Sequence, residues 1–316
     1  MSDTRREYTF CSRLSVTAEE CRFGTASSIL ENWFLLEYPR PWAPDAVEDS
    51  ILPIPVKEHL ASHFQSIRRS RILLIKQRPH MTGPIRFFVA LSTEAHPRLY
   101  EFQLSTYEEL LDLDVLAALA GDQQYERYRR EEPLFLVCTH GTHDMCCAKF
   151  GLPVYHELAA RAGDAVWQCS HVGGDRFAAN VLCFPHAIYY GHVEPHEAAA
   201  IAESYGDDRL YLEKYRGRSC YRFAVQAAEY FLRQETGIMA LSAFRLLDTR
   251  RLEPDRYLVH FFELASGVTH AIHIAAVKSE FRNFLTCKRN VWSNVPQYRL
   301  IAHHMVSPEE SGQATP

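Results

Sequence analysis

The chain has 316 residues, enough for two domains or one large one, and its composition (47% hydrophobic, 23% charged) is that of a globular protein. The formal net charge of −5 argues against a nucleic-acid-binding protein, which normally carries a clustered basic surface. No apolar run approaches the roughly 18 residues of a membrane helix, and residues 1–10 contain no apolar signal core. We therefore expect a cytoplasmic protein with no membrane partner and no nucleic-acid partner.

The first segment reads as an α/β unit. Residues 1–30 are expected to be irregular, and a strand is predicted over 32–37. The spacing of Val56, Leu60, Phe64 and Ile67 predicts a helix over 56–67. Strands are then predicted over 71–76, 85–91 and 99–104. A helix over 106–119 is expected to begin with a capping box formed by Thr106 and Glu109.

The second segment repeats this order. Strands are predicted over 133–138, 165–170, 181–185 and 188–193, with helices over 148–162 and 195–205. Both 32–119 and 133–205 thus read strand, helix, strand, strand, strand, helix. This is the minimal thioredoxin-like topology, so a diverged tandem pair is one interpretation of the chain.

The remaining residues predict a helix over 219–234 and strands over 245–247, 257–264, 269–277 and 297–301. The predicted fold class is therefore α/β, with thioredoxin-like units and a small C-terminal helix-plus-β extension. The predicted domains are an N-terminal α/β domain (1–125), a thioredoxin-like ferredoxin domain (130–208), the C-terminal extension (209–304) and a disordered tail (305–316).

Soft metal ligands gather at two neighbouring strand ends. Cys138 ends one predicted strand, and Cys146 and Cys147 open the following helix, where amide dipoles stabilise thiolates. The next strand ends at Cys169, and His171 follows it. Four ligands from two such loops are the usual requirement of a binuclear iron–sulfur cluster. Any one of these cysteines could instead pack in the core, and packing is expected for Cys11, Cys21, Cys183, Cys220 and Cys287.

The segments VCTHGTHDMCCAKFG (137–151) and CSHVGGDRFAANVLCFPHAIYYGHV (169–193) resemble the sucrase/ferredoxin-like family. Two flanking segments, FGTASSILENWFLLEYPRPW (23–42) and YRGRSCYRFAVQAAEYFLR (215–233), are also similar to that family. The resemblance implies a thioredoxin-like ferredoxin with a [2Fe–2S] cluster, in which Cys138 and Cys147 bind one iron. His171 and the position of Asp175 then bind the other iron, and Asp175 stands where the family has histidine.

The fourth ligand is open at this stage. Asp175 could bind iron through its carboxylate, Cys169 could supply a thiolate instead, or the cluster could be labile or absent. Cys146 is an alternate for Cys147. His140 and His143 are expected to be hydrogen-bond donors near the cluster or surface residues, and Asp144 to fix the loop by an Asx-type bond.

The expected role is one-electron transfer rather than stand-alone catalysis. No Gly-x-Gly-x-x-Gly fingerprint for a nicotinamide or flavin occurs, so a separate reductase is the expected partner. No motif suggests the carboxylate pair that sucrose cleavage would need. The alternatives are a thiol–disulfide oxidoreductase, a structural zinc site at Cys138, Cys147, Cys169 and His171, and a scaffold without cofactor. The sequence does not define an oligomeric state.

Overall fold

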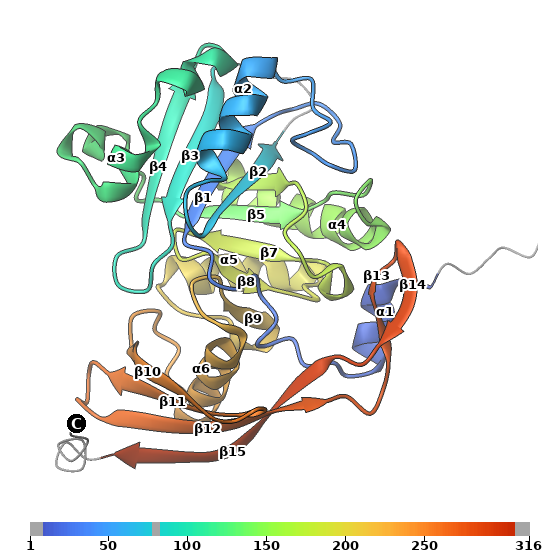
Figure 1. The fold of residues 1–316 in the computed structure, drawn as a ribbon, viewed down its shortest axis with the longest axis vertical. Coiled ribbons are helices and arrows are strands. Elements are labelled where there is room, and N and C mark those ends of the chain that lie inside the picture. Colours follow the sequence, from blue (N-terminus) through green and yellow to red (C-terminus); the bar gives the residue numbers. More distant parts are fainter. Residues whose placement is uncertain (1–8, 78–82, 307–316) are drawn as a thin grey trace, which may run out of the picture.

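A nine-stranded sheet forms the centre of the computed structural model, which describes residues 9–77 and 83–306 (Figure 1). The strand order is β4-β3-β1-β2-β6-β5-β7-β8-β9. The first half supplies β1 (Asn32–Glu37), β2 (Ser70–Lys76), β3 (Ile85–Leu91) and β4 (Arg98–Leu104). The second half supplies β5 (Leu134–Cys138), β6 (Val166–Cys169), β7 (Val181–Phe184), β8 (Ile188–Tyr190) and β9 (Tyr215–Arg218). The predicted mixed α/β class is thus confirmed.

The two halves of the sheet repeat one pairing scheme. In each half the first two strands are parallel, the third is antiparallel to the first, and the fourth is antiparallel to the third. The halves join where β2 and β6 pair antiparallel, with Ile75 opposite Cys169. The sheet therefore runs without a break from one half into the other.

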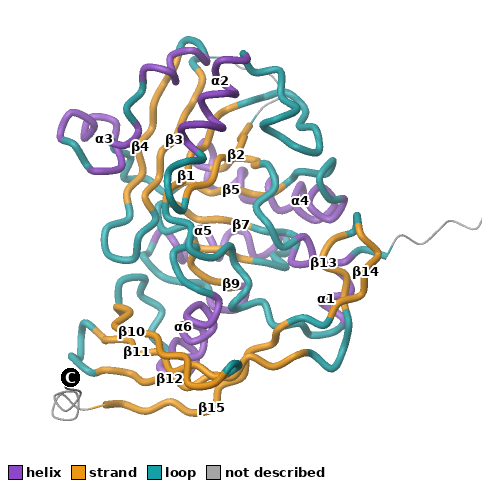
Figure 2. Tube along the Cα trace, viewed as in Figure 1, coloured by secondary structure: helices purple, strands orange, loops and turns teal. Residues whose placement is uncertain are grey.

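Helices cover the outer faces of both halves (Figure 2). The first half carries α2 (Ile54–His59), which continues as a π-helical turn over Leu60–Phe64, and α3 (Val115–Ala120). The second half carries α4 (Met145–Ala162) and α5 (Ala198–Gly206). Short 3₁₀ turns lie at Tyr107–Asp112, Gln123–Tyr128, Gly163–Ala165, Asp175–Phe177, Pro195–Glu197 and Leu212–Lys214.

The sheet curls, so that the inner faces of its two halves pack against each other. Trp33 and Leu35 of β1 share a buried cluster with Leu134 and Leu136 of β5. The ring of Trp33 meets that of Phe184 edge-on at 5.3 Å between centroids. Strand alternation sends the intervening side chains of β1 and β5 outward, under α2 and under α4 and α5 respectively. Cys138 follows the inward set and therefore faces the interior between the halves.

The C-terminal region forms a second layer. A four-stranded antiparallel sheet has the order β10-β11-β12-β15, with bounds Phe244–Glu253, Arg256–Glu263, Thr269–Lys278 and Pro296–Val306. Helix α6 (Phe223–Thr236) packs its apolar side on this sheet. Between β12 and β15, the hairpin of β13 (Asn283–Thr286) and β14 (Arg289–Ser293) lies beside α1 (Cys11–Thr17) (Figure 1).

Several predicted elements were wrong. The segment 1–30 contains α1, and the helix predicted over 106–119 is two short pieces. Leu113 is extended and the side chain of Asp114 accepts a hydrogen bond from the amide of Ala117, which starts α3 afresh. The side chain of Thr106 makes no capping bond. β9, β13 and β14 were not predicted, and helix α6 starts at Phe223 rather than at Ser219 because a turn after β9, closed by a hydrogen bond from the amide of Tyr221 to the carbonyl oxygen of Arg218, precedes it.

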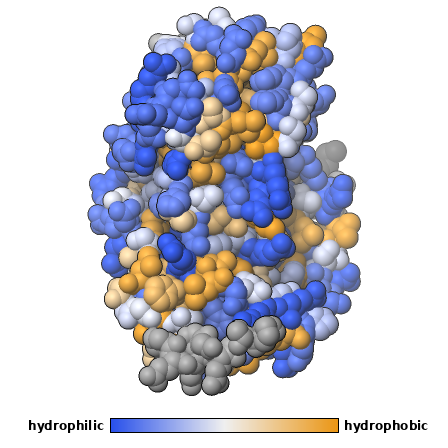
Figure 3. Space-filling model, turned by 60° about the vertical axis from the view of Figure 1, so that its left-hand side comes forward, coloured by the Kyte–Doolittle hydropathy of each residue, from blue (hydrophilic) through white to orange (hydrophobic). Residues whose placement is uncertain are grey.

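The predicted domain boundaries stay predictions, and the predicted tail lies outside the described residues except for Met305 and Val306, which end β15. Within residues 9–77 and 83–306, no helix combines the length and the apolar character that crossing a bilayer requires. Figure 3 shows one face of the molecule, on which hydrophobic residues form separate patches among hydrophilic ones.

Candidate metal centre

The end of β5 and the start of α4 bring two cysteines together. Cys138 is the last residue of β5, and Cys147 lies in the first turn of α4. Asp144 is the N-cap of α4, and its Oδ1 accepts a hydrogen bond of 2.8 Å from the amide of Cys146, which confirms the predicted Asx-type bond. Gly151 lies one helical turn after Cys147, and a Cβ there would lie 2.2 Å from the carbonyl oxygen of Cys138. A glycine at this position therefore lets α4 approach the end of β5.

Histidine and carboxylate groups complete the cluster of donors. The ligand atoms of Cys138, Cys147 and His171 all lie within 4.8 Å of one another. The Sγ atom of Cys147 is 3.9 Å from His171 Nδ1 and 3.6 Å from Asp175 Oδ1. His171 Nδ1 and Asp175 Oδ1 are 3.1 Å apart. The four residues predicted as ligands thus lie together at one corner.

The two cysteines are fully enclosed, whereas the side chain of His171 is 19% exposed. Hydrogen bonds from Cys147 and Cys169 hold the pKa of the Cys138 thiol well below its usual range, and His171 acts in the same direction. Burial raises the pKa of Asp175 to about 6, although the neighbouring His171 opposes that shift. The corner therefore favours a thiolate at Cys138, in a position closed off from solvent.

The first half of the chain holds the loop between Cys138 and α4. His140 donates from Nε2 to the carbonyl oxygen of Ala43 at 2.8 Å, so its Nδ1 is free to accept from the amide of His171 at 3.1 Å. The hydroxyl of Thr142 donates to the carbonyl oxygen of Trp42. His140 is therefore a hydrogen-bonding residue that orients His171, in agreement with one of the two predicted roles.

His143 lies closer to the donors than its sequence position indicates. Its ring stacks on that of His171 at 3.8 Å between centroids. Its ligand atom, with those of His171 and Asp175, forms a second group within 4.8 Å. His143 is thus a further candidate for the fourth position, whereas the sequence favoured a hydrogen-bonding or surface role for it over ligation.

The Gly173-Gly174 loop packs against a buried arginine. Gly174 has a φ of +77°, and a Cβ there would lie 2.3 Å from Nη2 of Arg216. Arg216 donates from Nη1 to Asn180 Oδ1 at 2.6 Å. On the other side, Arg71 donates from Nη2 to the carbonyl oxygen of His171 at 2.8 Å. Gly174 therefore makes room for the guanidinium group of Arg216, and the two arginines fix the loop that carries His171 and Asp175.

The two alternate ligands, Cys169 and Cys146, lie in different surroundings. Cys169 is buried and hydrogen bonds to Cys138, but it belongs to none of the donor groups found among the described residues. Cys146 lies instead with Cys11, Cys287 and Asp144 in a separate group. Cys11 and Cys287 were expected only to pack, and nothing in the local sequence around either cysteine indicates this meeting.

The fold and the site together define an α/β protein with a curled sheet and cysteine-rich groups that could hold a metal ion. The family model described as sucrase/ferredoxin-like matches residues 23–217, and the chain belongs to that family. The chain is also similar to Altered inheritance of mitochondria protein 32 of Meyerozyma guilliermondii, with 29% identity over 110 residues. The match covers 30% of this chain and 37% of that protein, well under two thirds of its length.

Proposed function

We propose that this chain is an electron-transfer protein that holds a [2Fe–2S] cluster at Cys138, Cys147, His171 and Asp175. The observation that carries the proposal is the convergence of these four side chains, from two separate loops, on one corner of the sheet. Two cysteines paired with two other donors would place thiolates on one iron and harder ligands on the second.

The residues present fit such a group. Cys138 and Cys147 are enclosed among apolar residues, a setting in which a buried thiolate needs a nearby cation. His171 and Asp175 lie on the more open side and contact each other. A hard carboxylate and an imidazole suit an iron ion, and a thiolate pair suits the same metal.

The repeated strand pairing supports a thioredoxin-like origin for both halves. In each half the spatial order is second, first, third, fourth strand, with a helix between the first two. We interpret the chain as two thioredoxin-like units joined edge to edge through β2 and β6. The second unit carries Cys138 and Cys147, and the first supplies the backbone acceptors that fix the loop between Cys138 and Asp144.

A [2Fe–2S] cluster, when bound, takes up and returns one electron. The chain itself determines where the cluster meets other molecules. Cys138 and Cys147 are closed off from solvent, whereas His171 is partly exposed and therefore marks the side on which a redox partner docks. Because the chain has no nicotinamide or flavin fingerprint, a separate reductase would supply the electrons.

The test is anaerobic purification of the full chain, followed by its visible spectrum and by iron and acid-labile sulfide counts. Two irons and two sulfides per chain would support the proposal. Cys138→Ala and Cys147→Ala should lose both, whereas Cys183→Ala, at a buried cysteine in the core behind α4, should keep them. A colourless protein that resists reconstitution would contradict the proposal, and zinc at the same cysteines would indicate a structural site.

A second measurement addresses the fourth ligand. Asp175→His replaces an anionic ligand by a neutral one, so the reduction potential should rise, because the reduced state carries the extra negative charge. His143→Ala tests the other candidate at this position. An intact cluster with an unchanged potential in Asp175→His, together with cluster loss in His143→Ala, would assign the position to His143 instead.

A further inference from the structure

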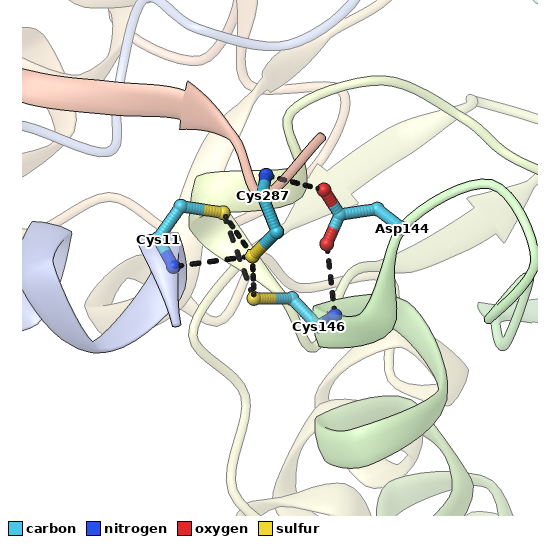
Figure 4. Close-up of side chains that lie close together, drawn as sticks. All are labelled: Cys11, Asp144, Cys146 and Cys287. Atoms are coloured by element: carbon cyan, nitrogen blue, oxygen red, sulfur yellow. Dashed lines mark hydrogen bonds between the residues drawn. The ribbon is translucent and has the colours of Figure 1, made fainter. Parts of the chain in front are cut away.

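Three cysteines from distant parts of the chain meet beside the first site (Figure 4). Cys11 begins α1, Cys146 lies in the first turn of α4, and Cys287 lies in the turn between β13 and β14. Their Sγ atoms form a nearly equilateral triangle, with distances of 3.5 Å (Cys11 to Cys146), 3.3 Å (Cys146 to Cys287) and 3.4 Å (Cys287 to Cys11). Cys11 and Cys146 are fully buried, and Cys287 is half-buried.

A carboxylate lies within the same group. The ligand atom of Asp144 is within 4.8 Å of those of the three cysteines. Asp144 is 2% exposed, and its Oδ2 accepts from the amide of Cys287 at 2.7 Å and from the hydroxyl of Thr286 at 2.8 Å. These bonds hold the hairpin turn against the start of α4, so the position of Cys287 is fixed by the fold.

The triangle has the size of a single tetrahedral metal site. With metal–sulfur bonds of about 2.3 Å, two thiolates on one zinc ion lie about 3.8 Å apart. The observed spacing is a few tenths of an ångström shorter. An ion 2.3 Å from all three sulfurs would lie roughly 1.2 Å above their plane and leave a fourth position open. A disulfide would instead bring one pair together and exclude the third sulfur.

We propose that Cys11, Cys146 and Cys287 bind one thiophilic divalent cation of the zinc type, with Asp144 as the nearest fourth donor. This site is separate from the one at Cys138 and Cys147 and does not depend on it. Three thiolates and one oxygen match the soft-ligand preference and closed coordination of structural zinc. The bound ion would fasten α1 and the β13–β14 hairpin to the start of α4.

The experiment measures zinc, iron and sulfide in the full-length protein, purified anaerobically from zinc-supplemented medium. The wild-type chain should carry one zinc ion. Cys287→Ser and Cys11→Ser should lose it and keep their iron and sulfide, whereas Cys138→Ala should keep the zinc. Cys220→Ser, at a half-buried cysteine remote from both groups, is the matched control and should change neither metal.

A measurement on the unmodified chain covers the case in which these variants fail to fold. Cobalt should displace the zinc and give the intense sulfur-to-metal absorption of a thiolate site. Alkylation followed by mass spectrometry should show Cys11, Cys146 and Cys287 protected by metal and reactive after chelation. Absence of zinc and cobalt uptake by folded protein, or a disulfide between any two of the three, would overturn the proposal.

Discussion

Replacing Gly151 by alanine should open the first site by about an ångström. The added Cβ would lie 2.2 Å from the carbonyl oxygen of Cys138, whereas carbon and oxygen normally approach to about 3.3 Å. The clash is with the backbone carbonyl group of Cys138, which no side-chain rotation can relieve, so α4 must move away from the end of β5. Because Cys147 lies one turn earlier on the same helix, its sulfur moves with the helix. Overpacking of this kind costs about 1–3 kcal/mol in the free energy of unfolding.

The assay compares chemical denaturation and iron content for the wild type, Gly151→Ala and Gly206→Ala. Gly206 is the matched control, since it ends α5, is exposed, and has no atom within 4 Å of an added Cβ. Alanine there should stabilise the chain by up to about 1 kcal/mol through helix propensity. Gly151→Ala should lose stability and should hold less iron after identical reconstitution. Wild-type stability together with full iron content in Gly151→Ala would refute the reasoning.

Three further predictions follow from buried groups. Glu229→Gln should cost about 3–5 kcal/mol in the free energy of unfolding, because it leaves the buried Arg218 and Arg233 without their carboxylate partner. The control Glu203→Gln removes one partner of an exposed ion pair and should cost at most about 1 kcal/mol. Equal losses of the two variants in chemical denaturation would contradict this reasoning. Burial lowers the pKa of His186 to about 3, so the unfolded chain takes up a proton below pH 6.5 that the folded chain does not. Stability should therefore fall by about 1.4 kcal/mol per pH unit from 6.5 toward 3, and His186→Gln should remove that part of the slope; an unchanged slope would count against it. Gly174→Ala places a Cβ against the guanidinium group of Arg216, at a residue whose backbone φ is positive. The variant should therefore have a lower melting temperature and a lower iron content. A melting temperature and an iron content equal to those of the wild type would show that the loop adjusts freely.

Most strands could be predicted because their sequences are rich in large apolar, β-branched and aromatic residues and end at turn residues. The strands at 32–37 and 85–91 were predicted with their observed bounds. The failures include the missed strands β9, β13 and β14 and helices whose apolar spacing continues through a break in the backbone. Between 106 and 119 the pattern did not reveal that Asp114 caps a new helix. Local side-chain capping outweighed periodicity there.

The candidate site, like the fold, has parts that the sequence predicts and parts that it does not. Cys138, the adjacent Cys146 and Cys147, and His171 could be chosen because they follow neighbouring strands, whose ends lie at one sheet edge. The choice of Cys147 over Cys146, and of Asp175, rested on the resemblance to the sucrase/ferredoxin-like family. The contacts made by Trp42, Ala43 and Pro44 could not, because they depend on the way the two halves of the sheet meet. The second sulfur group was equally hidden, since 276 residues separate Cys11 from Cys287.

The adjacent Cys146 and Cys147 show why sequence spacing alone could not assign their roles. Successive residues of an α-helix point about 100° apart, so the two sulfurs at the start of α4 face different surroundings. Cys147 faces Cys138 and His171, and Cys146 faces Cys11 and Cys287. A vicinal pair in this position therefore serves two donor groups at once, and any shift of the first turn of α4 would alter both. Loss of the second metal should for that reason loosen the first turn of α4 without removing the iron and sulfide of the first site, since the two groups share no ligand.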